Sequence, residues 1–190
     1  MGTLIQRSRR KRCFARVLLL FVLFSLPSIL AQKGPKPLPN GTAAEYDIKA
    51  AFLLNFARFV EWPQPSERAG SPFAICILGD DPFGDSINHI IAGESISGRP
   101  FAVKHLRRWP DSCELLFISA SYPSQASVLA QVGTDVLTVG EAPDFLRDGG
   151  MIRFFIDDRR VRFDINRLAV DRSALKMSSR LLGVARRVLE

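Results

Sequence analysis

Few residues of the kinds that build metal centres and nucleophilic active sites occur in this chain. Its 190 residues include two histidines, His89 and His105, and three cysteines. A zinc site of the usual Cys/His spacing cannot be assembled locally from so few ligands. Neither histidine has an obvious carboxylate to orient its ring, as a catalytic imidazole requires. We therefore expect both histidines to be structural or solvated, and we expect no metal site.

Nucleotide-binding and nucleophile motifs are absent as well. There is no Gly-x-Ser-x-Gly sequence, and Gly79–Gly84 is neither a dinucleotide-binding fingerprint nor a P-loop. Asp80 and Asp81 resemble the acidic pocket of phosphorylated receiver domains, but that pocket needs a further aspartate where this chain has Ser119. Because aspartate is a usual turn and capping residue, we expect the pair to shape the turn. The sequence predicts neither an enzyme nor a cofactor.

The chain also lacks an apolar run long enough for a membrane span. A basic segment without acids precedes an apolar run from Val17 to Leu26, and the small residue Ala31 follows. A membrane anchor, which is the alternative, needs roughly 20 apolar residues. A charged start, a short apolar run and a small residue are typical of a secretory signal. We predict a signal peptide over residues 1–31 and secretion into the periplasm.

Without residues 1–31, the chain has almost no net charge. The whole chain has 26 basic and 19 acidic side chains, a net charge of +7. Residues 1–31 hold six basic groups and no acidic one, so the remainder holds 20 against 19, or +1. A protein this close to neutral has no electrostatic footprint for nucleic acid. We exclude nucleic acid as a partner.

The cysteines fit an oxidising compartment. Cys13 leaves with the signal peptide, so the mature chain keeps one pair, Cys76 and Cys113. A disulfide between them is worth about 4 kcal/mol in the loop-closure model. Two buried free thiols are the alternative, because free cysteine is a commonly buried residue.

Two further regions follow the signal peptide. Residues 32–42 are rich in proline and glycine and predict a disordered leader. Residues 43–190 have the length of one domain. The domain starts with a predicted helix that Pro63 stops, and Lys49 falls largely outside its apolar stripe. The side chains expected to face the core are Ile48, Phe52, Phe56 and Phe59.

Strands alternate with helices along the rest of the domain. The predicted strands are 73–78, 99–106, 113–118, 136–139 and a hairpin of 151–156 with 160–165, and the predicted helices are 86–91, 124–131, 142–147 and 173–189. This order predicts an α/β fold, in which a mostly parallel central sheet has helices on both faces and a C-terminal β-hairpin plus helix. In the common 2-1-3 strand order, the first and third strands are neighbours, which would place Cys76 beside Cys113.

Six segments resemble the YfiR-like family and occur in the family's order. They are Lys49–Pro63, Leu78–Gly84, Leu137–Val139, Gly149–Phe154, Val161–Asn166 and Leu175–Leu182. The resemblance covers about residues 43–186. It implies a periplasmic regulator that restrains an inner-membrane diguanylate cyclase by binding the cyclase's periplasmic sensor domain. An outer-membrane lipoprotein that sequesters the regulator, another membrane receptor and a second copy of the chain are further candidate partners. The second cysteine pair of some members is missing here.

The matching segments do not fix the residues that contact a partner. Arginine and aromatic side chains are enriched in interface hot spots, and the candidates on the hairpin and the last helix are Arg153, Phe155, Arg162 and Arg180. Solvated charge or core packing is the alternative for each of them. The alternative function is a small-ligand sensor or solute-binding module with a pocket near Gly79–Gly84 and Ser119–Pro123.

Overall fold

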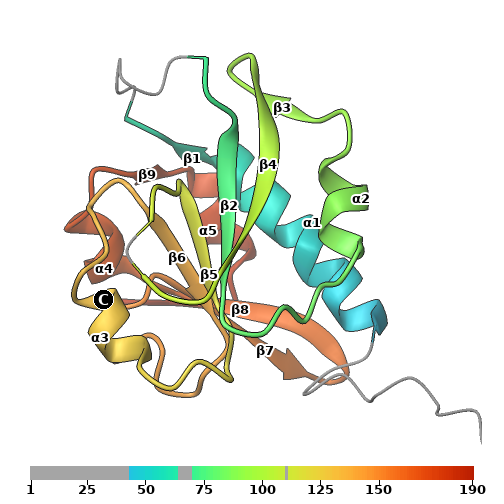
Figure 1. Cartoon of the computed structure of the whole chain (residues 1–190). Coiled ribbons are helices and arrows are strands. Elements are labelled where there is room, and N and C mark those ends of the chain that lie inside the picture. The colour runs from blue at the N-terminus through green and yellow to red at the C-terminus, as the bar shows by residue number, and fades with distance from the viewer. Residues whose placement is uncertain (1–42, 64–69, 110) are drawn as a thin grey trace, which may run out of the picture. The chain divides into compact units, whose positions relative to one another are not determined.

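The computed structural model describes residues 43–63, 70–109 and 111–190 (Figure 1). The predicted signal peptide and leader lie outside these residues. The helices are α1 (Ala43–Phe59), α2 (Ser86–Ile91), α3 (Gln125–Leu129), α4 (Arg167–Asp171) and α5 (Ser179–Val184). Within the described ranges, no helix is both long enough and apolar enough to span a bilayer.

Eight strands form one mixed sheet. They are β2 (Phe73–Leu78), β3 (Ser95–Ile96), β4 (Arg99–Leu106), β5 (Leu115–Ile118), β6 (Leu137–Gly140), β7 (Ile152–Asp157), β8 (Arg160–Asn166) and β10 (Arg187–Leu189). Their order is β10-β8-β7-β6-β5-β2-β4-β3. The strands from β4 to β7 in this order run parallel, β7 and β8 form an antiparallel hairpin, and β10 runs parallel to β8. The predicted α/β class is confirmed.

The centre of the sheet is buried on both faces. Every residue of β2, β5 and β6 is buried, as expected of parallel strands whose sequences are almost continuously apolar. The order β4-β2-β5 is the predicted 2-1-3 order. It follows that β2, the first predicted strand, lies between β4 and β5, the second and third predicted strands.

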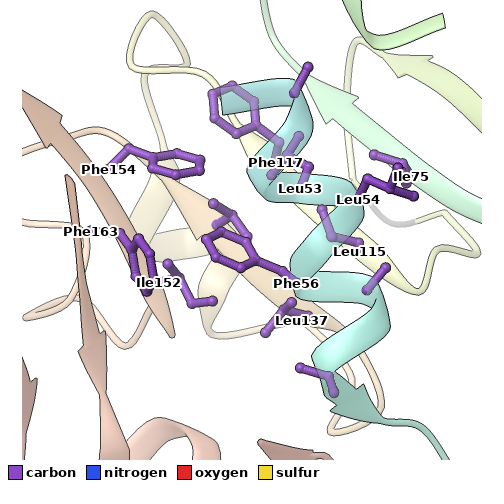
Figure 2. Packing of buried hydrophobic residues seen from close by; sticks show 14 of the residues in the cluster. Leu53, Leu54, Phe56, Ile75, Leu115, Phe117, Leu137, Ile152, Phe154 and Phe163 are labelled. Atoms are coloured by element: carbon purple, nitrogen blue, oxygen red, sulfur yellow. The ribbon is translucent and has the colours of Figure 1, made fainter. Parts of the chain in front are cut away.

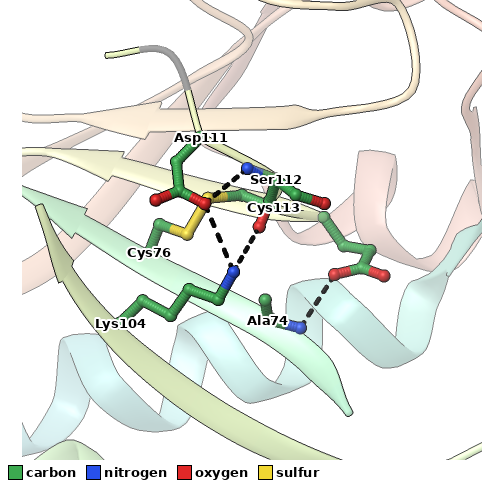
Figure 3. The surroundings of a disulfide bond; sticks show 7 residues. Ala74, Cys76, Lys104, Asp111, Ser112 and Cys113 are labelled. Atoms are coloured by element: carbon green, nitrogen blue, oxygen red, sulfur yellow. Dashed lines mark hydrogen bonds and ion pairs between the residues drawn. A yellow bond between two sulfur atoms is a disulfide. The ribbon is translucent and has the colours of Figure 1, made fainter. Parts of the chain in front are cut away.

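A disulfide joins Cys76 in β2 to Cys113, which precedes β5, with their Cα atoms 6.0 Å apart. The strand order brings these positions together, because β2 and β5 are hydrogen-bonded neighbours. Close to the bridge, Lys104 Nζ donates to the Ser112 carbonyl at 2.9 Å and pairs with Asp111 Oδ1 at 3.3 Å (Figure 3). The segment that leads into β5 is therefore tied to both β2 and β4.

Side chains alternate between two faces of the sheet. Ile75, Leu115 and Phe117 belong to a core with α1 and α2, and we call this side the α1 face. Cys76, Leu116 and their neighbours pack with Val128 of α3 and with the loop after β6, and we call this side the α3 face. Figure 2 shows Leu53, Leu54 and Phe56 of α1 pointing into the first of these cores. Helices cover both faces, as predicted.

The orientation of α1 differs from the prediction. Phe56 is fully buried and Phe52 and Phe59 are partly buried, but Ile48 is 48% exposed and Lys49 is only 3% exposed. The helix is rotated so that Tyr46, Lys49, Ala50, Leu53, Leu54, Phe56 and Ala57 face inward. It also ends at Phe59, because the next two residues form β1 (Val60–Glu61).

Lys49 is buried because it has acidic partners. Its Nζ donates to Glu45 one turn earlier and to Glu141 at the end of β6. It also lies 4.4 Å from the centre of the Tyr46 ring, and the Tyr46 hydroxyl donates to Glu141 Oε2 at 3.2 Å. Burial, followed by the charge of Glu141, raises the pKa of Tyr46 above its usual value.

The predicted helix 173–189 is wrong. The chain forms β9 (Lys176–Met177), then α5, then β10. β9 pairs with β1, and β10 pairs with β8. The Ser178 side chain accepts from the Leu181 amide and caps the start of α5. Ala185 is extended, with ψ of 145°, so the helix cannot continue. Pairing with distant strands therefore outweighs the local helical pattern.

Two smaller elements also differ. The predicted helix 142–147 is a series of turns that buries Phe145, whose ring lies against Gly140 and Gly150. A Cβ at Gly140 would come within 2.4 Å of that ring, so only glycine permits this packing. The short helix α4 was not predicted. Asn166 caps it by accepting from the Ala169 amide at 3.1 Å.

Candidate docking surface

The last part of the sheet carries arginines on its α3 face. In β7 and β8 the side chains on the α1 face are buried in the core with Phe154 and Phe163. The alternate side chains point to the opposite face, where the register sets Arg153 beside Asp164 and Phe155 beside Arg162. β10 sets Arg187 beside Asp164 as well. We call this set the arginine surface, and it consists of Arg153, Phe155, Arg162, Asp164, Arg186 and Arg187.

A buried carboxylate holds two of these arginines. Asp164 is fully buried, and its Oδ2 lies 2.9 Å from Arg187 Nη2 and 3.4 Å from Arg153 Nη2. The hydrogen bond to Asp164 raises the pKa of Arg187. Arg153 also donates to the Pro143 carbonyl at 2.7 Å. A buried charge needs such partners, so Asp164 fixes the positions of both guanidinium groups.

Two guanidinium groups lie over the ring of Phe155. The Cζ atom of Arg153 is 5.4 Å from the ring centre, and that of Arg186 is 5.0 Å away. These distances are within the range of a cation–π interaction. Arg186 Nε also lies 3.4 Å from Asp157 Oδ2. Phe155 is only partly buried, so the stack forms part of the protein surface.

The structure brings together three of the four predicted contact residues. Arg153, Phe155 and Arg162 belong to the arginine surface. Arg180 does not, because it is in α5 and lies over the Phe59 ring of α1 at 5.8 Å, on the α1 face. Arg162 is exposed and has no ion pair with any residue that the structure describes.

Sequence reasoning missed Asp164, Arg186 and Arg187. The alternation of the hairpin could have placed Asp164 on the same face as Arg153. No local pattern could have placed Arg187 there, because its position depends on the pairing of β10 with β8.

The loops at the strand ends are packed together rather than open. A Cβ at Gly79 would lie 3.3 Å from the Cβ atoms of Ser119 and Tyr122. Asp81 Oδ1 accepts from the Phe83 amide at 2.7 Å, so Asp81 has the turn role that was predicted for the aspartate pair. Asp81 Oδ2 also lies 3.5 Å from His105 Nδ1, so the expectation that His105 has no carboxylate neighbour is wrong.

The His105 side chain is 53% exposed. Among residues 43–63, 70–109 and 111–190, no group of three or more His, Cys, Asp or Glu side chains is placed to hold a metal ion.

A hollow of about 470 Å³ lies between α2 and the β3–β4 hairpin. Its lining includes Asn88, Ile91, Phe101 and Val103. It is separate from the strand-end loops in which the small-ligand alternative places its pocket. Among the residues that the structure describes, Glu94 is the one acidic or basic residue in its lining.

The model of the YfiR/HmsC-like family matches residues 46–186, which includes nearly all of α1 and every strand of the sheet except β10. No curated protein matches the chain.

Proposed function

The chain belongs to the YfiR/HmsC-like family, and on this premise we propose that it is a periplasmic regulator that acts by protein contact. It binds the periplasmic sensor domain of an inner-membrane signalling protein and holds that protein inactive. The target is a diguanylate cyclase, so the regulator lowers the cellular level of cyclic-di-GMP.

The family match over residues 46–186 is the observation that carries this proposal. The family generally regulates cyclic-di-GMP cyclases. The physical basis is linkage, because a regulator that binds the inactive form of its target more tightly must shift the population toward that form.

Two further observations support the periplasm as the place of action. The start of the chain has the pattern of a signal peptide over residues 1–31. The Cys76–Cys113 disulfide is a bond that persists in oxidising compartments. An outer-membrane lipoprotein that competes for the regulator would relieve the inhibition in the same compartment.

Deletion of the gene tests the proposal in the cell. We expect the deletion strain to have raised cyclic-di-GMP and more biofilm, because the cyclase is freed from restraint. Cyclic-di-GMP is measured by mass spectrometry of cell extracts, and a plasmid copy of the gene should restore the original level.

Direct binding is tested with purified components. The protein should retain the periplasmic domain of the membrane cyclase encoded nearest to its gene in a pull-down. Absence of binding, together with unchanged cyclic-di-GMP in the deletion strain, would rule out the cyclase as the target.

A further inference from the structure

Charge is unevenly distributed along the chain. Residues 151–190 contain ten basic and five acidic side chains, a net charge of +5. Residues 32–150 contain ten basic and fourteen acidic side chains, a net charge of −4. The net charge of residues 32–190 is therefore close to zero although residues 151–190, which contain β7, β8 and β10, are basic.

The arginine surface has more cations than Asp164 and the neighbouring Asp157 can pair. Asp164 already has two guanidinium partners, and Asp157 lies beside Arg186. Arg162 has no ion pair with a described residue and is exposed. An added carboxylate could therefore pair with Arg162 without first breaking an ion pair to a described residue. Arg186 and Arg187, nearby on the same surface, are already positioned by Asp157 and Asp164.

The shape of this part of the sheet suits an extended chain. The core on the α3 face contains residues of α3 and of the loop after β6, and no residue of β7, β8 or β10. β10 is the last strand in the sheet order, and within the described residues no strand pairs with its outer edge. Val188 and Leu189 in β10 are 38% and 40% exposed. Edge strands offer free backbone groups to which another chain can add as a strand.

We propose that the arginine surface, with the outer edge of β10, is the docking site for an extended, acidic segment of a partner protein. The segment adds beside β10, and every second side chain then points to the α3 face. Its carboxylates pair with Arg162, Arg186 and Arg187, because a guanidinium group can donate two parallel hydrogen bonds to one carboxylate. This inference rests on the proposed function and specifies the chemistry of the partner.

A synthetic peptide tests the site directly. The probe is a fluorescein-labelled ten-residue peptide of alternating Glu and Val, titrated with protein purified after export and followed by fluorescence anisotropy. We expect binding that weakens as salt is added. A Lys/Val peptide of the same length should not bind. The Glu/Val peptide with N-methylated backbone amides should bind less tightly, because it cannot donate to the β10 edge.

Matched charge reversals locate the binding. Arg162→Glu should lower the affinity for the Glu/Val peptide by about tenfold or more, as expected when attraction becomes repulsion. Arg180→Glu changes the net charge equally but lies on the α1 face, so it should leave the affinity unchanged. Because Arg162 is exposed and has no ion pair with a described residue, Arg162→Glu should unfold at the same temperature as the wild type, which separates lost binding from lost fold.

The outcomes separate this inference from the proposed function. Equal weakening by Arg162→Glu and Arg180→Glu, or equal binding of the Lys/Val peptide, would overturn the site. Binding to anionic lipid vesicles but not to the Glu/Val peptide would overturn it too, in favour of a membrane surface. If the cyclase domain binds and Arg162→Glu does not weaken that complex, the site is wrong while the proposed function stands. If the peptide binds as expected and the cyclase domain does not, the site stands and the proposed target is wrong.

Discussion

Lys49 shows how a charged side chain is accommodated in the core. It is 3% exposed in the middle of a helix face, a position that lysine occupies only when it is paired. Glu45 and Glu141 supply that pairing, and the Tyr46 ring lies alongside. Removal of one member of such a group leaves a buried charge without compensation, which costs more than the intact pair contributes.

Replacement of Lys49 by methionine should therefore lower the free energy of unfolding by about 3–5 kcal/mol. Urea denaturation followed by circular dichroism measures this loss. Lys176→Met is the matched control, because Lys176 is exposed and its replacement should change stability by less than about 0.5 kcal/mol. A second change, Glu141→Gln, should recover part of the loss in the Lys49 variant. Similar small effects of both lysine variants would contradict the buried ion pair.

The helix α1 is the element that organises the α1 face. Phe56 is fully buried and its ring lies 5.0 Å from Phe163 and 5.6 Å from Phe154, so α1 is packed directly on the β7–β8 hairpin. Ile48, on the same helix, is 48% exposed. The two apolar residues should therefore differ sharply in what they contribute to stability.

We expect Phe56→Ala to cost about 3–5 kcal/mol, because it removes a buried ring and leaves a cavity. Ile48→Ala, on the outward side of the same helix, should cost less than about 1 kcal/mol, in the range of surface substitutions. Thermal and urea unfolding of the two variants measure the difference. If Ile48→Ala were the more damaging change, Ile48 would face the core, as the sequence pattern predicts, and the orientation of α1 in the structure would be wrong.

β2, β4, β5, β6, β7 and β8 were predicted closely because their signals are local, whereas β1, β3, β9 and β10 were not predicted. β2, β5 and β6 are almost continuously apolar, and the hairpin alternates at period two. The rotation of α1 could not be predicted in this way, because the burial of Lys49 depends on Glu141, 92 residues away. Residues 173–189 have helical spacing, but β9 and β10 within them pair with β1 and β8. Such pairing with distant strands cannot be predicted from a local pattern. Because Arg187 reaches the arginine surface only through the pairing of β10 with β8, the sequence did not indicate it as a contact residue. Arg153, Phe155 and Arg162 lie on the β7–β8 hairpin, whose alternating pattern does predict which side chains share a face.

For the molecule as a whole, the disulfide and the predicted signal peptide make one joint prediction. Protein recovered from the periplasm should begin near Gln32 and show no free thiol when it is unfolded without reductant. Replacement of Cys76 or Cys113 should lower the stability by about 2–5 kcal/mol. Mass spectrometry, thiol titration and denaturation measure these three quantities. Two titratable thiols per chain would contradict the bridge, and an intact start at Met1 would contradict cleavage.

The pairing of β1 with β9 has a consequence for the order in which the fold can be completed. Val60 pairs with Met177, and the Phe59 carbonyl accepts from the Ser178 amide at 3.0 Å. The strand pairing that follows the first helix therefore needs residues about 120 positions later in the chain. Contacts so distant in sequence form late and slow the folding rate. During synthesis, the pairing of β1 with β9 therefore cannot form until the chain has been made as far as Ser178.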